Sequence, residues 1–425
     1  MSWTFLSRAA VCGVMLLSAL PALAQTAPSI DRKVQARIDR ILKRTPLIDG
    51  HNDLPEQLRE NYGMRVEKLA SGAAAWTPKP LMTDIQRLHH GRVGGQFWSV
   101  YIDASVHGDE AIRQTLEQID IVDRLVKAYP DDLALAKTAD DIVRIHKSGR
   151  IASLIGIEGG HQIGGSMAAL RQFYRLGGRY LTLAHFDTND WADSATDDPK
   201  YDGLAPFGVA VVKEMNRIGM LVDLAHVSPA TMSDALDVSA APVIFSHSNA
   251  RAIEDHPRNV PDDILRRLPA NGGVVMVNFY SGYLSEPFRQ WSAEQAAEDA
   301  RLKSLLVGQP DKRDAAMKAW MAAHPQPVVA LSEVADHIDH IAKVAGYDHV
   351  GLGGDLDGIP TAPAGLDSVA GYPLVFAELI RRGWTDDNLA KLAGGNVLRV
   401  LRRAEAVAAS MKDVPPSMAT LDTAK

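Results

Sequence analysis

The stretch PLIDGHNDLP, residues 46–55, joins an apolar lead-in to an imidazole and a carboxylate. Leu47 and Ile48 predict the start of a buried strand, and His51 and Asp53 follow it two positions apart. Side chains at positions i and i+2 of an extended strand point to the same side. His51 and Asp53 therefore converge on one point at the end of the strand, which indicates a metal site.

Comparable apolar runs recur along the chain, with helical patterns between them. We expect strands at Leu47–Asp53, Gly95–Ile102, Ile151–Glu158, Tyr180–His185, Leu221–His226, Val243–His247, Gly273–Tyr280 and His349–Asp355. Amphipathic segments predict helices at Glu110–Ala128, Met167–Leu176, Pro206–Asn216, Pro229–Leu236 and Val334–Ala345. Strands that alternate with helices favour parallel pairing through crossover helices. The pattern predicts a (β/α)8 TIM barrel, with an open doubly wound sheet as the alternative.

Ligand-type residues at the ends of the predicted strands distinguish these two folds. They close six of the runs and are His51, Asp53, Glu158, His185, His226, His247 and Asp355. In an open sheet, only the strands beside the topological switch point would offer such residues. In a barrel, every strand end faces the same mouth. Their distribution therefore favours the barrel.

Taken together, these side chains form the ligand set of a divalent metal centre. Histidine and carboxylate without thiolate are typical of catalytic zinc and similar ions. The set is too rich for one ion, since a catalytic zinc takes three protein ligands. Two ions that share a carboxylate fit it better, and Glu158 is the candidate bridge. Two such ions, about 3.5–4 Å apart, can activate a water and polarise a carbonyl group.

Other polar residues near the strand ends are candidates for catalysis or support. Asp355 is placed to carry a proton from water to a leaving amine, but Asp357 points the same way, so spacing leaves the choice open. His185 is a candidate for stabilising a developing oxyanion. We expect His161 to support a ligand and Asp49 to orient the ligands of the first strand. The remaining histidines are expected to be structural: His89, His90, His107, His146, His324, His337, His340 and His349.

The composition is that of an ordinary globular protein, with 425 residues, 46% hydrophobic and 23% charged. A formal charge of −7 argues against nucleic acid or an anionic membrane as a partner. We expect a single domain over residues 25–405, followed by a polar tail, 406–425, without a lipid-anchor signal. The surplus over a minimal barrel lies mainly in residues 56–94 and 284–330. The second insert is a candidate lid over the mouth, with a solvated helical hairpin as the alternative.

The N-terminus predicts a secretory signal peptide over residues 1–24. Arg8 precedes an apolar run over residues 9–20, and Ala22-Leu23-Ala24 forms a small-residue cleavage site. An uncleaved anchor is the alternative. Cys12, the single cysteine, lies inside this segment, so the mature chain would have no disulfide, thiol nucleophile or zinc–thiolate site. We expect an exported protein, periplasmic or secreted, with no membrane anchor after cleavage.

Eight motifs occur in one order along the chain: LIDGHNDLP, IGIEGGHQI, LTLAHFDTNDWADS, VDLAHVS, VIFSHSNARAI, HPRNVPDD, VMVNFYSGYLS and VGLGGDLDGI. In these motifs the chain resembles the membrane (renal) dipeptidases, zinc peptidases of the metal-dependent hydrolase superfamily. The resemblance runs from about Pro46 to Arg402, nearly the whole expected mature chain.

The resemblance implies a (β/α)8 barrel that holds two zinc ions. His51 and Asp53 would hold one ion, His226 and His247 the other, and Glu158 would bridge them.

The resemblance also implies four roles at the substrate. They belong to His185 at the scissile carbonyl, Arg258 at the terminal carboxylate, Tyr283 in the pocket wall and Asp355 as the proton shuttle. A bidentate guanidinium suits a free carboxylate, and binding it one residue beyond the scissile bond would select dipeptides. One departure is Glu56, which stands where the mammalian members carry a tryptophan. The mammalian members also carry disulfides and a lipid-anchor signal, which the expected mature chain lacks.

The predicted function is zinc-dependent hydrolysis of the peptide bond of free dipeptides. Substrates with a C-terminal D-residue and carbapenem-like β-lactams are further options that the resemblance carries, and a homodimer is an option for assembly. One alternative is another binuclear metal hydrolase of the superfamily, acting on a lactone, a cyclic amide, a β-lactam or a phosphotriester. A second is a non-catalytic metal-binding barrel, which would predict loss of Glu158 or Asp355, although both are present.

Overall fold

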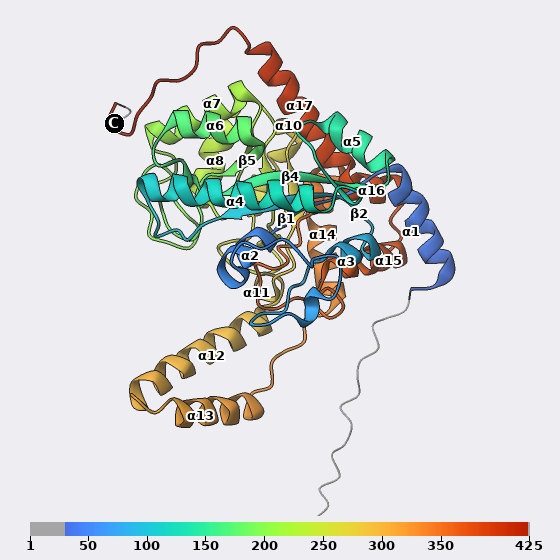
Figure 1. Ribbon diagram of the computed structural model, residues 1–425, viewed down its shortest axis with the longest axis vertical. Helices are drawn as coiled ribbons and strands as arrows, with labels where there is room; N and C mark the ends of the chain where they lie inside the picture. The colour runs from blue at the N-terminus through green and yellow to red at the C-terminus, as the bar shows by residue number, and fades with distance from the viewer. Residues whose placement is uncertain (1–29, 424–425) are drawn as a thin grey trace, which may run out of the picture.

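The computed structural model describes residues 30–423, and its centre is a closed barrel of parallel strands (Figure 1). The barrel strands, in spatial order, are β1 (Leu47–Asn52), β2 (Val93–Tyr101), β4 (Ile151–Glu158), β5 (Gly178–Thr182), β6 (Leu221–Asp223), β7 (Ile244–Phe245), β8 (Val274–Val277) and β9 (Val350–Leu352). β9 pairs with β1, and β2 pairs with β4 from Gly95↔Ala152 to Tyr101↔Glu158, so the sheet has no opening between them. The predicted (β/α)8 TIM barrel is confirmed, and the open doubly wound sheet is excluded.

Helices surround the barrel and cover its outer face. They are α1 (Arg32–Arg44), α2 (Leu54–Tyr62), α3 (Ile85–His90), α4 (Gly108–Ala128), α5 (Ala139–Lys147), α6 (Met167–Leu176), α7 (Pro206–Ile218), α8 (Pro229–Val238), α9 (Asp262–Leu265), α10 (Leu268–Asn271), α14 (Leu331–Ala345), α15 (Tyr372–Arg381), α16 (Asp386–Ala390) and α17 (Asn396–Ser410). Short helical turns complete the set: η1 (Ala73–Ala75), η2 (Gly160–Ile163), η3 (Tyr347–His349), η4 (Val369–Gly371) and η5 (Lys391–Gly395). All five helices named from the sequence are present within a few residues of their predicted ends.

Local sequence signals explain where several of these helices begin and end. The Ser228 hydroxyl accepts from Thr231 N at the start of α8, and Pro229 follows at the first helical position. α7 ends at Gly219, whose φ of 85° is a left-handed conformation that glycine adopts without a steric penalty.

The sequence analysis was wrong about the ends of several strands. The predicted strand Tyr180–His185 ends at Thr182, and Leu221–His226 ends at Asp223. His185, His226 and His247 therefore lie in loops just beyond the strands, because the chain turns out of the sheet before reaching them. His51 and Glu158 still belong to β1 and β4. A short ninth strand, β3 (Leu133–Leu135), pairs with the beginning of β4 and was also missed. Three residues are too few for a periodic pattern.

Two groups of apolar side chains form the core. The larger group fills the layer between the barrel and the surrounding helices. The smaller group joins Ile48, Phe97, Tyr180 and Met276 of the barrel strands to Leu401 of α17. β1 and β4 are buried along their whole length, as expected for parallel strands covered on both faces. The smaller group supports the metal-ligand loops from below.

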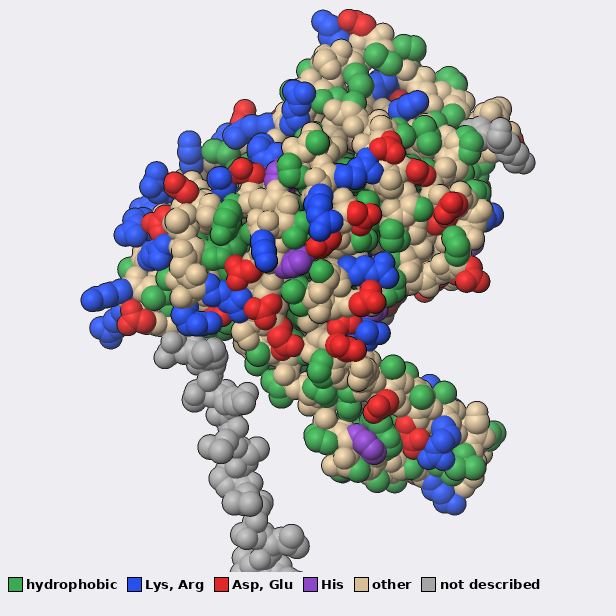
Figure 2. Space-filling model, turned by 180° about the vertical axis from the view of Figure 1, so that it is seen from behind, with side chains coloured by type: hydrophobic (Ala, Val, Ile, Leu, Met, Phe, Trp, Pro, Cys, Tyr) green, Lys and Arg blue, Asp and Glu red, His purple; other side chains and the backbone are tan. Residues whose placement is uncertain are grey.

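The insert after β8 forms a helical hairpin. It follows α11 (Ser281–Leu284) and consists of α12 (Glu286–Leu305) and α13 (Pro310–Ala323), with the predicted break around Gly308 between them. The hairpin projects away from the barrel in both views (Figures 1 and 2), and α13 has no buried residue. The first part of α12 is anchored to the core through Phe288 and Trp291, and Leu302 near its other end is also buried. The hairpin matches the alternative in the sequence analysis, and its action as a lid stays a prediction.

The two ends of the chain bear on the expected domain limits. The predicted signal peptide, residues 1–24, lies outside the described residues. α17 runs to Ser410, beyond the expected domain end at 405. The C-terminal tail then packs back on the barrel helices, where Arg171 Nη1 donates to Ser417 O and Ser417 N donates to Glu214 Oε2. Across residues 30–423, no helix combines the length and the apolar character that crossing a membrane requires.

Candidate active site at the barrel mouth

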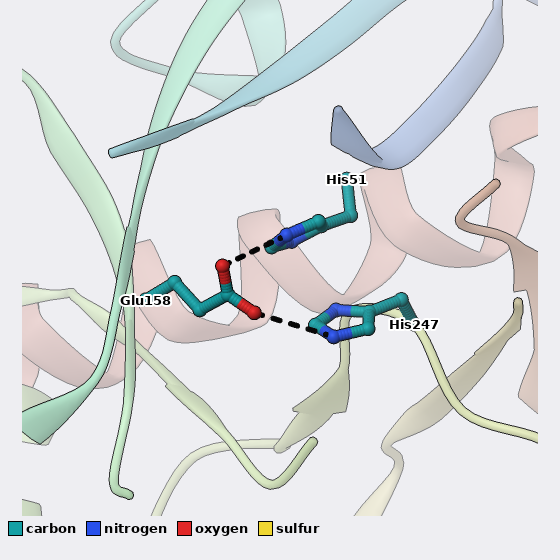
Figure 3. A group of neighbouring side chains, drawn as sticks. All are labelled: His51, Glu158 and His247. Carbon is teal, nitrogen blue, oxygen red and sulfur yellow. Dashed lines mark ion pairs between the residues drawn. The ribbon is translucent and has the colours of Figure 1, made fainter. Parts of the chain in front are cut away.

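Glu158, the last residue of β4, is the centre of the site. Its Oε2 lies 3.2 Å from His51 Nε2, and its Oε1 lies 3.0 Å from His226 Nε2 and 3.4 Å from His247 Nε2. Figure 3 shows the carboxylate between the rings of His51 and His247. His185 Nε2 also lies 3.4 Å from Oε1. Residues at or just beyond the ends of five different strands thus meet at one carboxylate, as the strand-end pattern predicts.

Three overlapping groups in this cluster have ligand atoms close enough to share an ion. They are His51, Glu158 and His247; Glu158, His185 and His226; and His51, Asp53 and Asp355. Every predicted metal ligand belongs to at least one group, and Glu158 belongs to two. The predicted division, with His51 and Asp53 at one ion and His226 and His247 at the other, stays a prediction. In the structure His247 is grouped with His51, and His226 is grouped with His185.

The residues present fit a divalent cation. Among the described residues, His51 Nε2 and Asp53 Oδ1 are buried without a hydrogen-bond partner. His226 Nε2 and His247 Nε2 lie 2.8 Å apart. Buried ionisable groups in a close cluster are costly unless a countercharge joins them. Imidazole and carboxylate, without thiolate, match zinc or a neighbouring divalent ion.

The electrostatics of the cluster favour an ionised Glu158 and neutral His226 and His247, the forms that bind a metal. Burial alone would raise the pKa of Glu158, but His51 and His185 hold it well below its usual range. Burial holds the pKa values of His226 and His247 well below the usual histidine value. Burial alone would lower the pKa of His51, but Glu158, Tyr180 and Asp53 raise it well above that value.

The backbone at His226 is strained. Its φ of 69° lies in the left-handed region, which a non-glycine residue occupies at an energetic cost. The bond from Ala195 N to His226 O, 2.8 Å long, holds this conformation. The left-handed backbone at His226 orients its imidazole toward Glu158.

Hydrogen bonds below the cluster orient two of the imidazoles, and sequence reasoning missed their partners. Tyr180 Oη lies 2.8 Å from His51 Nδ1 and donates to Gly50 O, so it accepts the His51 Nδ1 proton. Ser246 Oγ lies 2.8 Å from His247 Nδ1 and donates to Asp223 Oδ2. Both arrangements leave the Nε2 lone pair free to face the cluster.

Two further supporting residues complete this layer. Ser99 Oγ donates to Glu158 Oε2 at 3.0 Å, and Asn278 Nδ2 donates to Asp355 Oδ2 at 2.8 Å. Asn278 directly follows β8, so the strand-end rule would have found it had amides been included. Tyr180 and Ser99 lie within strands, where the end-of-strand signal is absent.

Asp355 and Asp357 separate in the structure. Asp355 faces His51 and Asp53, and burial, then Asp53, raise its pKa well above its usual range. Its φ is 59°, again left-handed. Asp357 turns away, since its Oδ1 accepts from Met82 N at 2.6 Å. Spacing alone did not distinguish Asp355 from Asp357, and the resemblance assigned the proton shuttle to Asp355. The structure agrees with that assignment, because Asp355 lies in the mouth.

Other residues singled out in the sequence lie outside the three groups. Asp49 accepts from Gly354 N at 2.8 Å and from Gln96 Nε2 at 2.9 Å, so it ties β1 to the loop after β9. His161 is buried in η2, and burial, then His185, lowers its pKa to about 4. Within the described residues, none of the histidines expected to be structural joins a ligand group.

Arg258 is a buried guanidinium beside the cluster. It is 1% exposed, and it makes long contacts from Nη1 to Ser248 Oγ at 3.5 Å and from Nη2 to His247 O at 3.3 Å, besides a side-chain contact with Tyr283. Its Nε has no hydrogen-bond partner among the described residues, and no carboxylate there pairs with it. The guanidinium carbon lies 5.2 Å from the centre of the Tyr283 ring. Burying an arginine without an anion is costly, so the site is prepared for an anionic ligand.

A cavity of about 360 Å³ opens at the mouth above the cluster. It is lined by Asp53, Glu56, Tyr101, Glu158, His185, Phe186, His226, Tyr280, Tyr283, Asp355, Gly358, Ile359 and Pro360. Its size suits a small molecule. The predicted metal ligands form its base and Tyr283 forms part of its wall, so a molecule bound in the cavity lies next to the cluster.

A parallel barrel with a histidine–carboxylate centre at its mouth defines a metal-dependent hydrolase. The family model described as membrane dipeptidase (Peptidase family M19) matches residues 35–414. The chain therefore belongs to the membrane dipeptidase family, and it is a metallo-dipeptidase.

Individual relatives agree with this family. An uncharacterized dipeptidase of Schizosaccharomyces pombe is 44% identical over 393 residues, which cover 88% of this chain and 85% of the relative. The dipeptidase verJ of Clonostachys rogersoniana is 40% identical over 390 residues, 89% of each chain. The crystal structure of PvdM from Pseudomonas aeruginosa, described as a probable dipeptidase, has a TM-score of 0.74 at 25% identity and covers 88% of this chain and 99% of that chain.

Proposed function

We propose that this metallo-dipeptidase cleaves free dipeptides with the aid of two zinc ions. His51, Asp53, Glu158, His226 and His247 would hold the ions, with Glu158 as the shared ligand. Zinc ions held there supply an activated water and polarise the scissile carbonyl. The richness of the donor set supports two ions over one.

The buried, unpaired guanidinium of Arg258 is the observation that carries the choice of free dipeptides. We assign it to the C-terminal carboxylate of the substrate, which would supply the missing anion through two charge-assisted hydrogen bonds. The carboxylate of a dipeptide lies one residue beyond its scissile bond. A longer peptide would place an uncharged amide at the same position, so Arg258 would discriminate against it.

Two residues act on the reacting atoms. An imidazole N–H of His185 donates to the scissile carbonyl oxygen and stabilises its negative charge in the transition state. Asp355 accepts a proton from the attacking water and returns it to the nitrogen of the departing amine. Its Oδ2 is already bonded to Asn278 Nδ2, so Oδ1 is the oxygen left to carry the proton. Tyr283 lines the cavity beside the substrate carboxylate.

A comparison of Ala-Ala with its C-terminal amide tests this assignment. Rapid cleavage of Ala-Ala, with kcat/KM at least about 100-fold lower for alanyl-alaninamide, is the expected result. Equal cleavage of the two compounds would refute the dipeptide assignment and favour another amide hydrolase.

We further propose that substrates with a C-terminal D-residue are included. The family resemblance supports this extension. L-Ala-L-Ala and L-Ala-D-Ala, assayed at equal concentration, decide it, since failure to cleave the L,D compound excludes the extension. The same panel should include a carbapenem and a simple lactone, which separate the dipeptidase assignment from the alternative hydrolase activities.

Export and assembly are also proposals. The signal-peptide pattern over residues 1–24 supports export, and cleavage after Ala24 would leave Gln25 as the mature N-terminus. N-terminal sequencing of protein recovered outside the cytoplasm tests this expectation, and an intact Met1 would contradict it. A homodimer is one option for the assembly, which light scattering on the mature protein tests.

A further inference from the structure

Glu56 is a carboxylate in the wall of the cavity that has no role in the mechanism above. It lies in the first turn of α2, three residues after Asp53, so both side chains are on the same face of the helix start. The cavity lining includes Glu56 together with Asp53, Tyr101 and Glu158. Its side chain is therefore open to a bound substrate.

No structural role within the described residues accounts for this carboxylate. Glu56 occupies the third helical position, where a glutamate can cap the helix, but α2 has no side-chain capping bond. Gln57 Nε2 donates to its Oε2 at 3.2 Å, and no lysine, arginine or histidine in residues 30–423 forms an ion pair with it. Burial, then Asp53, raises its pKa to about 9. Lys79 attracts the carboxylate from beyond ion-pair distance, so no cation within residues 30–423 contacts it.

The barrel order places Glu56 and Arg258 on different sides of the mouth. Arg258 contacts His247 O just after β7, whereas Glu56 follows β1 and Tyr101 ends β2. In the closed strand order, β2 lies four strands from β7 in either direction. A dipeptide whose carboxylate reaches Arg258, with its peptide bond over Glu158, therefore extends its amino end toward β1 and β2.

Tyr101 lies next to Glu56 at this amino end. Its ring centre is 4.5 Å from that of His185, and negative charge on Glu158 and Glu56 adds to the effect of burial in raising its pKa. The face of a tyrosine ring attracts a cation. A carboxylate and an aromatic ring in one wall form a setting that suits an ammonium or guanidinium group.

We propose that Glu56, with Tyr101, forms the subsite that binds a cationic group on the N-terminal residue of the substrate. This inference rests on the proposed function, because Arg258 and the scissile carbonyl define the direction of the dipeptide. The cation is either the α-ammonium group, which every free dipeptide carries, or the side chain of an N-terminal lysine or arginine. Glu56 thus acts as a specificity-determining residue.

The test uses full-length mature protein loaded with zinc and three substrates. Ala-Ala carries the α-ammonium group, propionyl-alanine lacks it, and Lys-Ala adds a side-chain cation. The variants are Glu56→Gln, which removes the charge at constant shape, and Glu56→Asp, which keeps it. Glu60→Gln is the matched control, because Glu60 is an exposed glutamate one turn further along α2. Zinc content and Tm are measured for each protein.

Each source of the cation predicts its own pattern. If the α-ammonium group binds, Glu56→Gln lowers kcat/KM about tenfold for both dipeptides, mainly through KM, and leaves propionyl-alanine unchanged. If the side chain binds, only Lys-Ala is affected. Glu56→Asp should retain most of the preference for substrates that carry the cation, and Glu60→Gln should retain all of this preference.

Other outcomes overturn the inference in distinguishable ways. Folded, zinc-loaded Glu56→Gln with kcat/KM within twofold of wild type on all three substrates would refute the subsite alone. Should Glu56→Gln fail to fold, loss of the preference in Tyr101→Ala supports the subsite, and an unchanged preference refutes it. Wild-type protein that cleaves neither dipeptide would refute the proposed function itself.

Discussion

At the scale of single residues, the site consists of charged groups whose partners are absent from the chain itself. Arg258 is buried with no carboxylate partner among the described residues, and Glu158 lies within 3.4 Å of four imidazoles. Burial of this kind is tolerated when a ligand completes the arrangement. Substitutions at these positions should therefore change binding and chemistry more than folding.

Arg258→Met should remove the preference for a free carboxylate. We expect kcat/KM for Ala-Ala to fall at least about 100-fold, mainly through KM, because charge-assisted hydrogen bonds to the substrate are lost. The rate with alanyl-alaninamide should stay the same. Steady-state kinetics on both substrates measure this, with Arg251→Met as the control, because Arg251 pairs with Asp255 at the surface. An unchanged ratio between the two substrates would contradict the role of Arg258.

Asp355→Asn should stop proton transfer. We expect kcat to fall by about 10²–10⁴, the usual contribution of a general acid–base group, at unchanged zinc content. Asp357→Asn is the matched control, because Asp357 lies outside the ligand groups and its Oδ1 accepts from Met82 N, which an asparagine oxygen can still do. Rates and metal content measured together check this. Near-normal kcat in zinc-loaded Asp355→Asn would assign the proton transfer to another group.

At the scale of elements, the strand ends explain how much could be read from the sequence. The predicted ligands all reach the mouth, because parallel strands around a barrel deliver their C-terminal ends to one face. Predicted strands such as Tyr180–His185 were too long, because a buried loop is as apolar as a strand. Tyr180 and Ser246 were missed because their task depends on neighbours across the barrel, which one sequence does not reveal.

The hydrogen bond from His51 of β1 to Tyr180 of β5 should strengthen zinc binding. Tyr180→Phe removes the acceptor of the His51 Nδ1 proton and should weaken zinc affinity about 10–100-fold, the usual loss when such a partner is removed. Titration against a competing chelator measures the affinity. Tyr347→Phe serves as the control, since Tyr347 is 43% exposed and lies in η3. Equal zinc affinity in the two variants would show that Tyr180 is not needed to orient His51.

The packing of α14 against the loop after β7 should make stability depend on pH. Burial lowers the pKa of His337 to about 4, and its neutral Nδ1 accepts from Ala250 N at 3.1 Å. Between pH 6.5 and 4 the unfolded chain binds a proton that the folded chain does not, so stability falls as pH falls. The shifted pKa of His337 lowers the free energy of unfolding by at most about 3 kcal/mol over this pH range.

Urea unfolding of metal-free protein between pH 7 and 4 tests the contribution of His337. His337→Asn, whose side-chain oxygen can accept from Ala250 N, should lose less stability on acidification than wild type. His90→Asn is the control, because His90 is exposed and should leave the pH dependence unchanged. Identical pH dependence in His337→Asn and wild type would contradict the assignment.

At the scale of the whole molecule, closure of the barrel allows distant segments to form one site. Residues at or just beyond the ends of β1, β4, β5, β6 and β7 meet around Glu158, and the loop after β9 adds Asp355. The hairpin of α12 and α13 contributes no residue to the cavity lining. The proposed chemistry therefore depends on the barrel and the candidate metal site at its mouth, so metal content is the property closest to the central claim.

The most direct measurement is the metal stoichiometry of purified mature protein by emission spectroscopy, with Ala-Ala hydrolysis assayed before and after chelation. We expect about two zinc ions per chain, with activity lost on chelation and restored by zinc. Two ions without dipeptide cleavage would retain the metal centre and move the substrate to another class. Full activity in metal-free protein, or no bound metal after zinc saturation, would contradict the account.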